Sequence, residues 1–458
     1  KGRAVWALRA QIDKKEYPKY IESLLQKNPN INIVEGEVIS FKTNKGCVSS
    51  VSLKDGRVFS CSALLVTCGT FLNGLIHIGS ASFPAGRMGE KPAQGLTESL
   101  KKHGLKTGRL KTGTPPRLSK KSINWSLAEK TLGDDIPSPF SLFTKRPFIK
   151  KQEDCYIVRT NQDVHSVIHN NMGFSAMFSG KIKGVGPRYC PSIEDKIDRF
   201  KHNPSHLLFL EPEWSNSDQI YLNGFSTSLP EEVQKEALRK IPALKEVSFI
   251  RPGYAIEYDY SPPYQLTAAL MSKSIGGLFF AGQINGTSGY EEAAAQGLVA
   301  GANALLYIQQ KEPLLLSRET SYIGVMIDDL VTSHLDEPYR MFTSRAEHRL
   351  YLRADNCYER LFLTAKNNNL LTQGQQETYN LFFKSLKTIS LWVKDFKLKN
   401  NNKTVSGEKH IKRPEISLFN LLKSGIDFES CRMLGVFIVL LTPILFVLIA
   451  ASMNTEIA

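Results

Sequence analysis

The sequence predicts an α/β fold with more than one domain, and three observations lead to that prediction. The chain has 458 residues, which is too long for one compact core, and 42% of them are hydrophobic, as in ordinary globular proteins. Residues 62–67 form a continuous apolar run that stops just before Gly69, which is typical of a buried parallel strand ending at a cofactor-facing turn. Residues 277–306 have the pattern of a strand, a glycine-rich loop and a helix.

The remaining pattern places further elements along the chain. Alternating residues predict three strands, at 32–38, 47–53 and 58–61. Residues 86–117 show little hydrophobic periodicity and are expected to form a connecting segment, and residues 119–152 are loop-rich. Mixed signals across residues 155–256 indicate an inserted α/β domain. Helices are expected at 231–240 and 291–306, and a charged helical region follows residue 317.

Charge and cysteine content narrow the function class. The 58 Lys and Arg residues exceed the 44 Asp and Glu residues, giving a net charge of +14. This excess favours a polyanionic partner such as nucleic acid, although the codon bias of an AT-rich genome explains it equally well. The seven cysteines are scattered and form no Cys-x-x-Cys pair, which argues against a disulfide framework or a metal site and fits a reducing compartment.

The end of the chain has an unusual composition. Residues 433–453 are uncharged and strongly apolar, and their number matches a bilayer span. A membrane anchor is one interpretation and a mis-joined gene end is the other, which we favour.

The glycine-rich loop within residues 277–292 is the strongest local signal. A helix beginning near Tyr290 would present unpaired N–H groups and partial positive charge at its N-terminus, which can hold a phosphate or the electron-rich edge of a reduced flavin. Ala293, Gly297 and Gly301 recur every four residues, so they are expected to let this helix lie close against a sheet. A plain strand–turn–helix packing unit is the alternative.

Cys190 is a candidate for covalent chemistry. It stands just before a predicted helix that Ser192 and Asp195 would cap, and beside Arg188, so both neighbours would favour the thiolate. A buried, unreactive cysteine is the alternative.

Two basic segments are candidates for phosphate or RNA contact. Residues 108–117 carry Arg109, Lys111 and Arg117 among glycines and prolines, and residues 337–349 carry Arg340 and Arg345 beside aromatic residues. Solvated or structural loops are the alternatives.

The loop sequence FFAGQINGTSGYEEAAAQG at residues 279–297 resembles the flavin-site motif of the GidA/MnmG family. Other blocks resemble the same family, in family order, and together they cover roughly residues 1–428: 4–13, 108–117, 186–196, 251–259 and 337–347.

The resemblance implies a doubly wound, glutathione-reductase-like FAD-binding sheet with an inserted NADH-binding-type α/β domain and a partial helical C-terminal region. The expected boundaries are 1–118 and 271–318 for the FAD-binding domain, 119–270 for the insertion, 319–430 for the start of a helical region that binds tRNA and a partner, and 431–458 for the apolar tail. Family members open with a Gly-x-Gly-x-x-Gly turn that holds the FAD pyrophosphate. That turn is absent from these residues, so the sequence is expected to lack the N-terminal start of the family. The resemblance ends near residue 428, so the sequence is also expected to lack the family's C-terminal domain.

The resemblance also implies cofactors and sites. FAD contacts are expected at Val38, Gly69, Gly282, Gln283, Asn285, Gly286 and Gly289. Ala93 replaces the serine that usually contacts FAD. NADH contacts are expected at Gly186, Pro187, Arg188, Tyr189, Ser192, Glu194, Asp195 and Lys196, with Cys190 as nucleophile or proton carrier.

The activity implied is addition of a carboxymethylaminomethyl or taurinomethyl group to carbon five of the tRNA wobble uridine, with FAD, NADH and methylene-tetrahydrofolate. The partners implied are tRNA and the GTPase MnmE, which would join a homodimer in a heterotetramer. The location would be cytoplasmic in a bacterium and mitochondrial in a eukaryote. Two other functions remain open: a folate- and FAD-dependent tRNA (uracil) methyltransferase, and a non-catalytic flavin- or RNA-binding remnant with a membrane tail.

Overall fold

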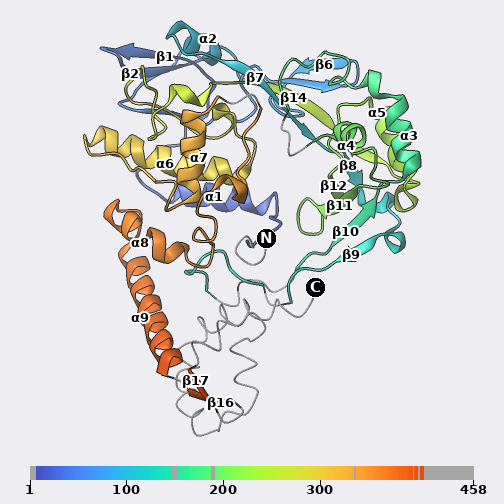
Figure 1. Ribbon diagram of the computed structural model, residues 1–458. Coiled ribbons are helices and arrows are strands. Elements are labelled where there is room, and N and C mark those ends of the chain that lie inside the picture. The colour runs from blue at the N-terminus through green and yellow to red at the C-terminus, as the bar shows by residue number, and fades with distance from the viewer. Residues whose placement is uncertain are drawn as a thin grey trace. The chain divides into compact units, whose positions relative to one another are not determined.

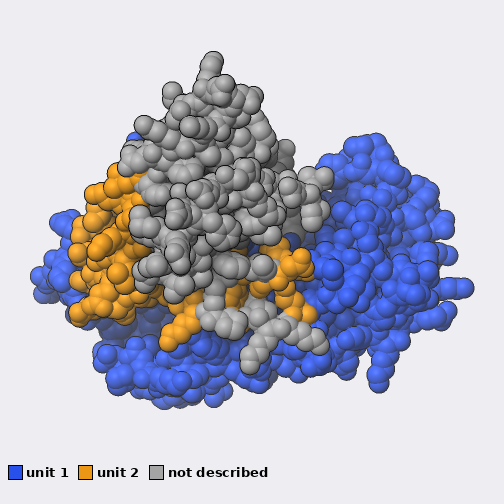
Figure 2. Space-filling view, turned by 90° about the horizontal axis from the view of Figure 1, so that it is seen from below, with its two compact units in different colours: residues 1–132, 153–361 blue, residues 133–152, 362–458 orange. Residues whose placement is uncertain are grey.

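The computed structural model describes residues 7–135, 137–145, 148, 152–186, 191–334, 337–395, 397–400 and 403–406. The chain divides into two compact units, which Figure 2 colours separately. The first comprises residues 1–132 and 153–361, and the second comprises residues 133–152 and 362–458. Cys190 and the apolar tail at 431–458 lie outside the described residues. No helix in the described part of the chain is long and apolar enough to cross a membrane.

An antiparallel meander near the start of the first unit contains β1 (Val38–Asn44), β2 (Cys47–Leu53) and β3 (Val58–Ser60). The helix α1 (Glu16–Gln26) precedes it. The strands predicted at 47–53 and 58–61 are confirmed. The strand predicted at 32–38 is wrong, because pairing begins only at Val38, opposite Leu53, and the residues before it are exposed. Alternation alone does not make a strand where no neighbouring strand pairs with it.

A parallel strand pair lies at the centre of the first core. The strands β4 (Leu64–Val66) and β15 (Leu278–Phe280) pair in parallel, and all three residues of β15 are buried. The helices α6 (Tyr290–Ile308) and α7 (Tyr322–Thr332) contribute further residues to this core, as do β1 and β2. The mixed α/β class is therefore confirmed, and the predicted strand–loop–helix unit lies where the sequence placed it.

A four-stranded antiparallel sheet has the order β6-β5-β14-β7. Its strands are β5 (Leu75–Ile78), β6 (Ala81–Pro84), β7 (Gly108–Thr114) and β14 (Tyr254–Tyr260). Residues 86–117 are therefore not a connecting segment, since they contain β7 and the helix α2 (Leu96–Lys102). The prediction failed because β7 carries Arg, Lys, Gly and Thr, and its polar face has no hydrophobic period to detect.

A six-stranded sheet contributes to a second core. Its strand order is β13-β8-β12-β11-β10-β9, and every pairing is antiparallel. Figure 1 shows α3 and α5 side by side at this sheet. The strands are β8 (Arg117–Ser119), β9 (Glu129–Thr131), β10 (Cys155–Arg159), β11 (Leu207–Pro212), β12 (Gln219–Asn223) and β13 (Phe249–Arg251). The helices are α3 (Gln162–Asn170), α4 (Ile193–Arg199) and α5 (Glu231–Arg239), and α5 confirms the helix predicted at 231–240.

The C-terminal part of the described chain is mainly helical, as predicted. The helix α8 (Cys357–Asn367) precedes α9 (Gln373–Asp395), and a short hairpin of β16 (Lys397–Asn400) and β17 (Lys403–Ser406) follows. Within the second unit the ring of Phe362 stacks on Tyr379 with centroids 3.9 Å apart, which gives α9 an aromatic contact.

A buried ion pair ties β8 to the end of β11. Arg117 Nε lies 2.8 Å from Glu213 Oε1, and the two side chains are only 13% and 5% exposed. Lys14 also reaches this carboxylate, at 3.1 Å, but its side chain is 49% exposed. Burial would raise the pKa of Glu213, but the hydrogen bonds and charges of Arg117 and Lys14 outweigh it and lower that pKa below its ordinary value. The ionised form of Glu213 is therefore favoured in the folded state.

We expect Arg117→Met to lower the free energy of unfolding by on the order of 3 kcal/mol at pH 7, because it leaves a buried carboxylate with one half-exposed partner. The stability that comes from this depressed pKa is fully present above the unfolded pKa of about 4.3. It is lost as the pH falls through the folded pKa. The difference from wild type should therefore shrink below about pH 4. Lys14→Met is the matched control and should cost less than about 1 kcal/mol in urea titrations. Equal losses for both variants would contradict this ranking.

Candidate functional site

The glycine-rich loop begins where β15 ends. Gly282 adopts φ of 86°, a conformation open to glycine, and starts the turn that leads through Gln283 and Asn285 to the helix α6. Gly289 directly precedes that helix, and a Cβ atom there would lie 1.6 Å from Oε2 of Glu292. No side chain fits at position 289 while the carboxylate of Glu292 lies against the helix N-terminus.

One buried amide, that of Gln296 on α6, holds the loop. Its Oε1 accepts hydrogen bonds from the N–H of Gly282 (3.2 Å) and from Nδ2 of Asn285 (2.8 Å). Its Nε2 donates to Oγ1 of Thr287 (3.0 Å) and to the carbonyl of Glu292 (3.1 Å). The Gln296 side chain is fully buried, so its four bonds fix the loop to its own helix in a water-poor environment.

A second segment, Tyr339 to Met341, is hydrogen-bonded to the loop. The N–H of Tyr339 donates to the carbonyl of Gly286 (2.7 Å), and the N–H of Ser288 donates to the carbonyl of Tyr339 (3.3 Å). The N–H of Met341 donates to Oε1 of Glu292 (2.9 Å). We call residues 339–341 the strap. It belongs to the predicted basic and aromatic segment, and it pairs with the loop through its backbone.

The aspartate Asp329 on α7 supports the strap. Its Oδ2 accepts a hydrogen bond from the hydroxyl of Tyr339 (2.9 Å), and the guanidinium of Arg345 lies 4.5 Å from the centre of the Tyr339 ring. Arg318 reaches Asp329 as well, at 2.6 Å. The sequence motif contains Gln296 but gives no sign of its role, and no sequence pattern pointed to Asp329 or Arg318. The spacing of Glu292, Gln296 and Asn303 on one helix face was the available signal.

The end of β4 lies beside the turn. The Oε1 atom of Gln283 lies 3.8 Å from the position that a Cβ on Gly69 would occupy, and Gly69 itself has φ of 57°. Burial raises the pKa of the neighbouring Cys68 to about 12, so this thiol is neutral at pH 7. The structure thus brings together Gly69, Gly282 and Gln283, three of the residues predicted to contact FAD.

The other residues predicted to contact FAD lie in two places. Asn285, Gly286 and Gly289 lie in the same loop, whereas Val38 is the first residue of β1 and packs at the edge of the first core. Ala93 pairs through its backbone with Leu72.

The loop still has hydrogen-bonding capacity suited to a ligand. Among the residues that the structure describes, Oδ1 of Asn285, Oγ of Ser288 and Oε2 of Glu292 are buried atoms with no hydrogen-bond partner. Such atoms are rare in native proteins and call for a partner. Oδ1 of Asn285 and Oε2 of Glu292 can each accept a hydrogen bond from an N–H at the polar edge of a ring, as flavin offers. The residues present therefore fit the polar edge of a flavin.

One feature of the sequence-based interpretation is wrong. The small residues Gly297 and Gly301 have open space where a Cβ would stand, so their face of α6 does not pack closely on a sheet. The buried face instead carries Glu292, Gln296, Val299, Ala300 and Asn303. Small side chains permit close packing but do not require it. The buried face of α6 is the one whose polar side chains hydrogen-bond to the loop and to neighbouring segments.

The predicted helix cap at Ser192 and Asp195 is confirmed. Oγ of Ser192 accepts from the N–H of Asp195 (3.2 Å), and Oδ2 of Asp195 accepts from the N–H of Ser192 (3.2 Å). Glu194 is fully buried and accepts from the N–H of Ser228 (3.0 Å), and Lys196 donates to the carbonyl of Gly224 (2.7 Å). Residues 187–190 lie outside the described residues, so the predicted roles of Pro187, Arg188, Tyr189 and Cys190 stay predictions.

Four of the five basic candidates for tRNA or phosphate contact pair with carboxylates. The pairs are Arg109 with Asp259 (2.7 Å), Arg117 with Glu213 (2.8 Å), Arg340 with Glu292 (3.5 Å) and Arg345 with Asp329 (3.5 Å). Each of these side chains has a structural role within the first unit. The fifth, Lys111, is 5% exposed and donates only to Sδ of Met177 at 3.0 Å within the described chain.

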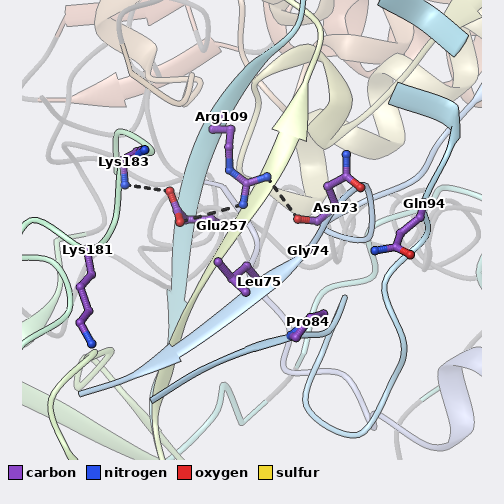
Figure 3. Close-up of a pocket in the computed structure, with 9 residues that line it drawn as sticks. All are labelled: Asn73, Gly74, Leu75, Pro84, Gln94, Arg109, Lys181, Lys183 and Glu257. Atoms are coloured by element: carbon purple, nitrogen blue, oxygen red, sulfur yellow. Dashed lines mark hydrogen bonds and ion pairs between the residues drawn. The ribbon is translucent and has the colours of Figure 1, made fainter. Parts of the chain in front are cut away.

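A pocket of about 410 Å³ is lined by one residue from each strand of the four-stranded sheet, Leu75, Pro84, Arg109 and Glu257, and by neighbouring segments. Figure 3 shows Arg109 between Glu257 and Asn73, with Lys181 and Lys183 on the segment opposite. Oε1 of Glu257 accepts from the N–H groups of Lys183 (2.9 Å) and Gly184 (2.7 Å).

Three neighbouring groups hydrogen-bond the carboxylate of Glu257. Its Oε2 lies 2.9 Å from Nε2 of His77. Burial would raise its pKa, but the bonds from His77 and the two backbone N–H groups, together with the charge of Arg109, lower that pKa instead. Glu257 is therefore an ionised carboxylate in the pocket wall, with both oxygens already engaged.

The Gln296 network yields a stability prediction. Gln296→Leu should lower the free energy of unfolding by on the order of 4 kcal/mol, because it strands buried donors on Gly282 and Asn285. Gln309→Leu, at the exposed end of the same helix, is the control and should change stability by less than about 0.5 kcal/mol. Chemical denaturation of both variants checks the difference. A Gln296→Leu protein as stable as wild type would show that the loop does not depend on this amide.

Comparisons with known proteins agree with these features. A family model described as glucose inhibited division protein A matches residues 1–312. A protein of Chlorobium chlorochromatii (strain CaD3), named tRNA uridine 5-carboxymethylaminomethyl modification enzyme MnmG, is 44% identical over 445 residues, covering 94% of this chain and 72% of the relative. A protein of the same name from Thermodesulfovibrio yellowstonii is 50% identical over 397 residues, covering 87% of this chain and 63% of the relative.

Solved structures agree as well. Aquifex aeolicus GidA in one crystal form superposes with a TM-score of 0.83 at 44% identity, covering 89% of this chain and 68% of that one. A second crystal form gives a TM-score of 0.85 at 41% identity, with coverage of 93% and 70%. With its fold, its glycine-rich loop and most of its length matched, the chain belongs to the GidA/MnmG family.

Proposed function

We propose that this chain is part of an FAD-dependent enzyme that adds a carboxymethylaminomethyl group at carbon five of the tRNA wobble uridine. The observation that carries the proposal is the loop of residues 282–289, which is fixed by Gln296 and by the strap. The loop contains buried polar atoms without partners in the described chain, and its Gln283 lies beside Gly69. The names of the relatives at 44% and 50% identity supply the substrate and the group transferred.

The residues of the chain would act by holding and orienting. Bound FAD would supply the redox chemistry of the reaction. Gly69 and Gly282 place no side chain at the turn, and Gln283 would offer its amide to the ring. Oδ1 of Asn285 is positioned to accept an N–H from a ring, and Glu292 keeps the start of α6 in place through the strap. Burial of these groups excludes water, which strengthens each polar contact.

The finer features of the reaction are proposals that rest on the family. NADH would bind along residues 186–196 and methylene-tetrahydrofolate would supply the one-carbon unit, with glycine or taurine as the amine. Cys190 would act as nucleophile or proton carrier. Because Glu194 is buried and Ser192 and Asp195 cap α4, we expect NADH to meet the backbone of this segment more than these side chains.

The macromolecular partners are proposed on the same basis. The partner of the whole protein would be the GTPase MnmE, bound by a homodimer, and tRNA would be the substrate. The bacterial relatives suggest a cytoplasmic location. The chain spans 63% to 72% of the length of the curated relatives described above, so the activity of the whole protein applies to this chain as a proposal.

Nucleoside mass spectrometry of tRNA tests the function. A strain without this gene should lose the carboxymethylaminomethyl group from its wobble uridine, and its ribothymidine should be unchanged. Loss of ribothymidine instead would contradict the proposal and identify the methyltransferase alternative.

The visible spectrum of the purified 458-residue chain tests the flavin site separately. A chain that retains the ring-binding half of the site should keep a flavin band at about 450 nm after incubation with FAD and removal of unbound FAD by gel filtration. Its absence, in a folded protein, would mean that the loop alone does not hold the cofactor.

A further inference from the structure

A serine, a histidine and a glutamate form a hydrogen-bonded chain on the four-stranded sheet. Oγ of Ser82 on β6 lies 2.8 Å from Nδ1 of His77 on β5. Nε2 of the same imidazole lies 2.9 Å from Oε2 of Glu257 on β14. A hydroxyl, an imidazole and a carboxylate in this order can activate a serine as a nucleophile. We call these three residues the triad, and none of them belongs to the glycine-rich loop.

The carboxylate determines which imidazole nitrogen carries the proton. Against the effect of burial, the bonds from His77 and from two backbone N–H groups lower the pKa of Glu257, so this group is ionised. An ionised carboxylate has no proton to donate, so Nε2 of His77 is the donor in their hydrogen bond. In the neutral imidazole Nδ1 is then an acceptor, and the hydroxyl of Ser82 donates to it. The proton of Ser82 therefore already points at the atom that would remove it.

The base is buried, whereas the serine is at the surface. The side chains of His77 and Glu257 are 3% and 4% exposed, so water does not compete for their hydrogen bond. Ser82 is an exposed residue of β6, which is an edge strand of the sheet. An electrophile in solution can therefore approach the serine, while the groups that activate it are held in the interior.

The hairpin of β5 and β6 is fixed at its turn. The N–H of Gly79 donates to the carbonyl of Ser228 (2.7 Å), and Nζ of Lys181 donates to the carbonyl of Ser80 (2.7 Å). Proton transfer requires that the nucleophile and its base keep their distance. These two bonds anchor the hairpin that carries both groups.

The register of the hairpin directs the N–H of Ser82 toward the open edge of the sheet. The N–H of Ala85 donates to the carbonyl of Gly74 (3.0 Å), and hydrogen-bonded and non-hydrogen-bonded positions alternate along an antiparallel pair. Ser82, opposite His77, is therefore at a non-hydrogen-bonded position, and its N–H points away from β5. An N–H of the nucleophile itself can stabilise the oxyanion that forms when the serine attacks an acyl group.

The pocket described above begins one residue pair away from the serine. Leu75 and Pro84 line it, and they form the next pair on the same face of the hairpin after His77 and Ser82 (Figure 3). Glu257 lines it as well. A substrate whose carbonyl carbon meets the serine would thus extend its acyl group over an apolar pair into the pocket.

We propose that Ser82 is an activated nucleophile and that the triad carries a second activity, the hydrolysis of small carboxylic esters. Oγ of Ser82 bonds to the carbonyl carbon, and its proton passes to Nδ1 of His77. The ester C–O bond then breaks, and this proton goes to the departing oxygen, which leaves as an alcohol. Water, deprotonated by His77, releases the acyl group from the serine as a carboxylic acid. The activity goes beyond the proposed tRNA modification and needs neither flavin nor tRNA.

Labelling of the full 458-residue chain with a fluorophosphonate tests the nucleophile directly. The serine oxygen displaces fluoride from phosphorus, and peptide mass spectrometry locates the added mass. Ser82 should react at least about a hundredfold faster than Ser60, because a positioned base contributes about that much or more. Ser60 is an exposed serine on β3 with no hydrogen bond to a histidine in the described chain, and it serves as the control within the same molecule. In urea the two serines should react at equal, slow rates.

Glu257→Gln tests the role of the carboxylate. The amide can donate to Nε2 of His77, which leaves the proton on Nδ1, so this nitrogen can no longer accept from Ser82. Labelling of Ser82 should therefore slow by on the order of a thousandfold, as expected when the wrong tautomer is held. Glu129→Gln, an exposed position on β9, is the control and should label at the wild-type rate.

Ser82→Ala connects labelling with turnover. It should abolish the label at this position and the saturable release of p-nitrophenol from p-nitrophenyl acetate that wild type should show. Its flavin band and its tRNA modification should be unchanged, so a failure of this proposal is distinguishable from a failure of the proposed function.

Three results would overturn the proposal. They are equal labelling of Ser82 and Ser60 in folded wild type, wild-type labelling in a folded Glu257→Gln protein, and ester turnover that is absent from wild type or undiminished in Ser82→Ala. The first comparison needs no variant, so it decides even if Glu257→Gln does not fold.

Discussion

The pleat of β14 is the constraint on which the arrangement of this protein depends. Alternate residues of a strand point to opposite faces, so seven consecutive residues can serve two environments. Tyr258 points toward Cys68 and Gln283 at the flavin-side turn, and burial raises its pKa. Glu257 and Asp259 point the other way, toward His77 and Arg109. A shift of one residue in the register of β14 would exchange these faces and place two carboxylates against the apolar core.

The glycine-rich loop depends on polar groups that come from distant parts of the chain. Gln296 fixes it from inside α6. The strap fixes it through two backbone–backbone hydrogen bonds and a third bond to the side chain of Glu292. The arginines that looked like RNA-binding residues in the sequence contribute here, since Arg340 pairs with Glu292 and Arg345 with Asp329. Their charges therefore stabilise the site from within, and any contact with tRNA would have to coexist with these ion pairs.

The sequence predicted those parts of the fold whose signal is local. The unit of β15, glycine loop and α6 was found because its apolar run, its glycines and its helix follow one another directly. The Ser192 cap was found for the same reason. The polar strand β7 was missed because its partner strand β14 is remote in the sequence and its own pattern has no apolar period. The buried face of α6 was misjudged because glycine spacing shows where close packing is possible, whereas the buried amides of Gln296 and Asn303 determine where it occurs.

The strap has a consequence for the order in which the protein is made. A ribosome releases the loop and α6 well before it releases Tyr339 and Met341, and domains generally begin to fold as they emerge. Until the later residues appear, water must satisfy the carbonyl of Gly286, the N–H of Ser288 and the carboxylate of Glu292. A nascent chain that stalls before residue 341 would thus carry an open, hydrated loop, and cofactor capture would be among the last events of its biogenesis.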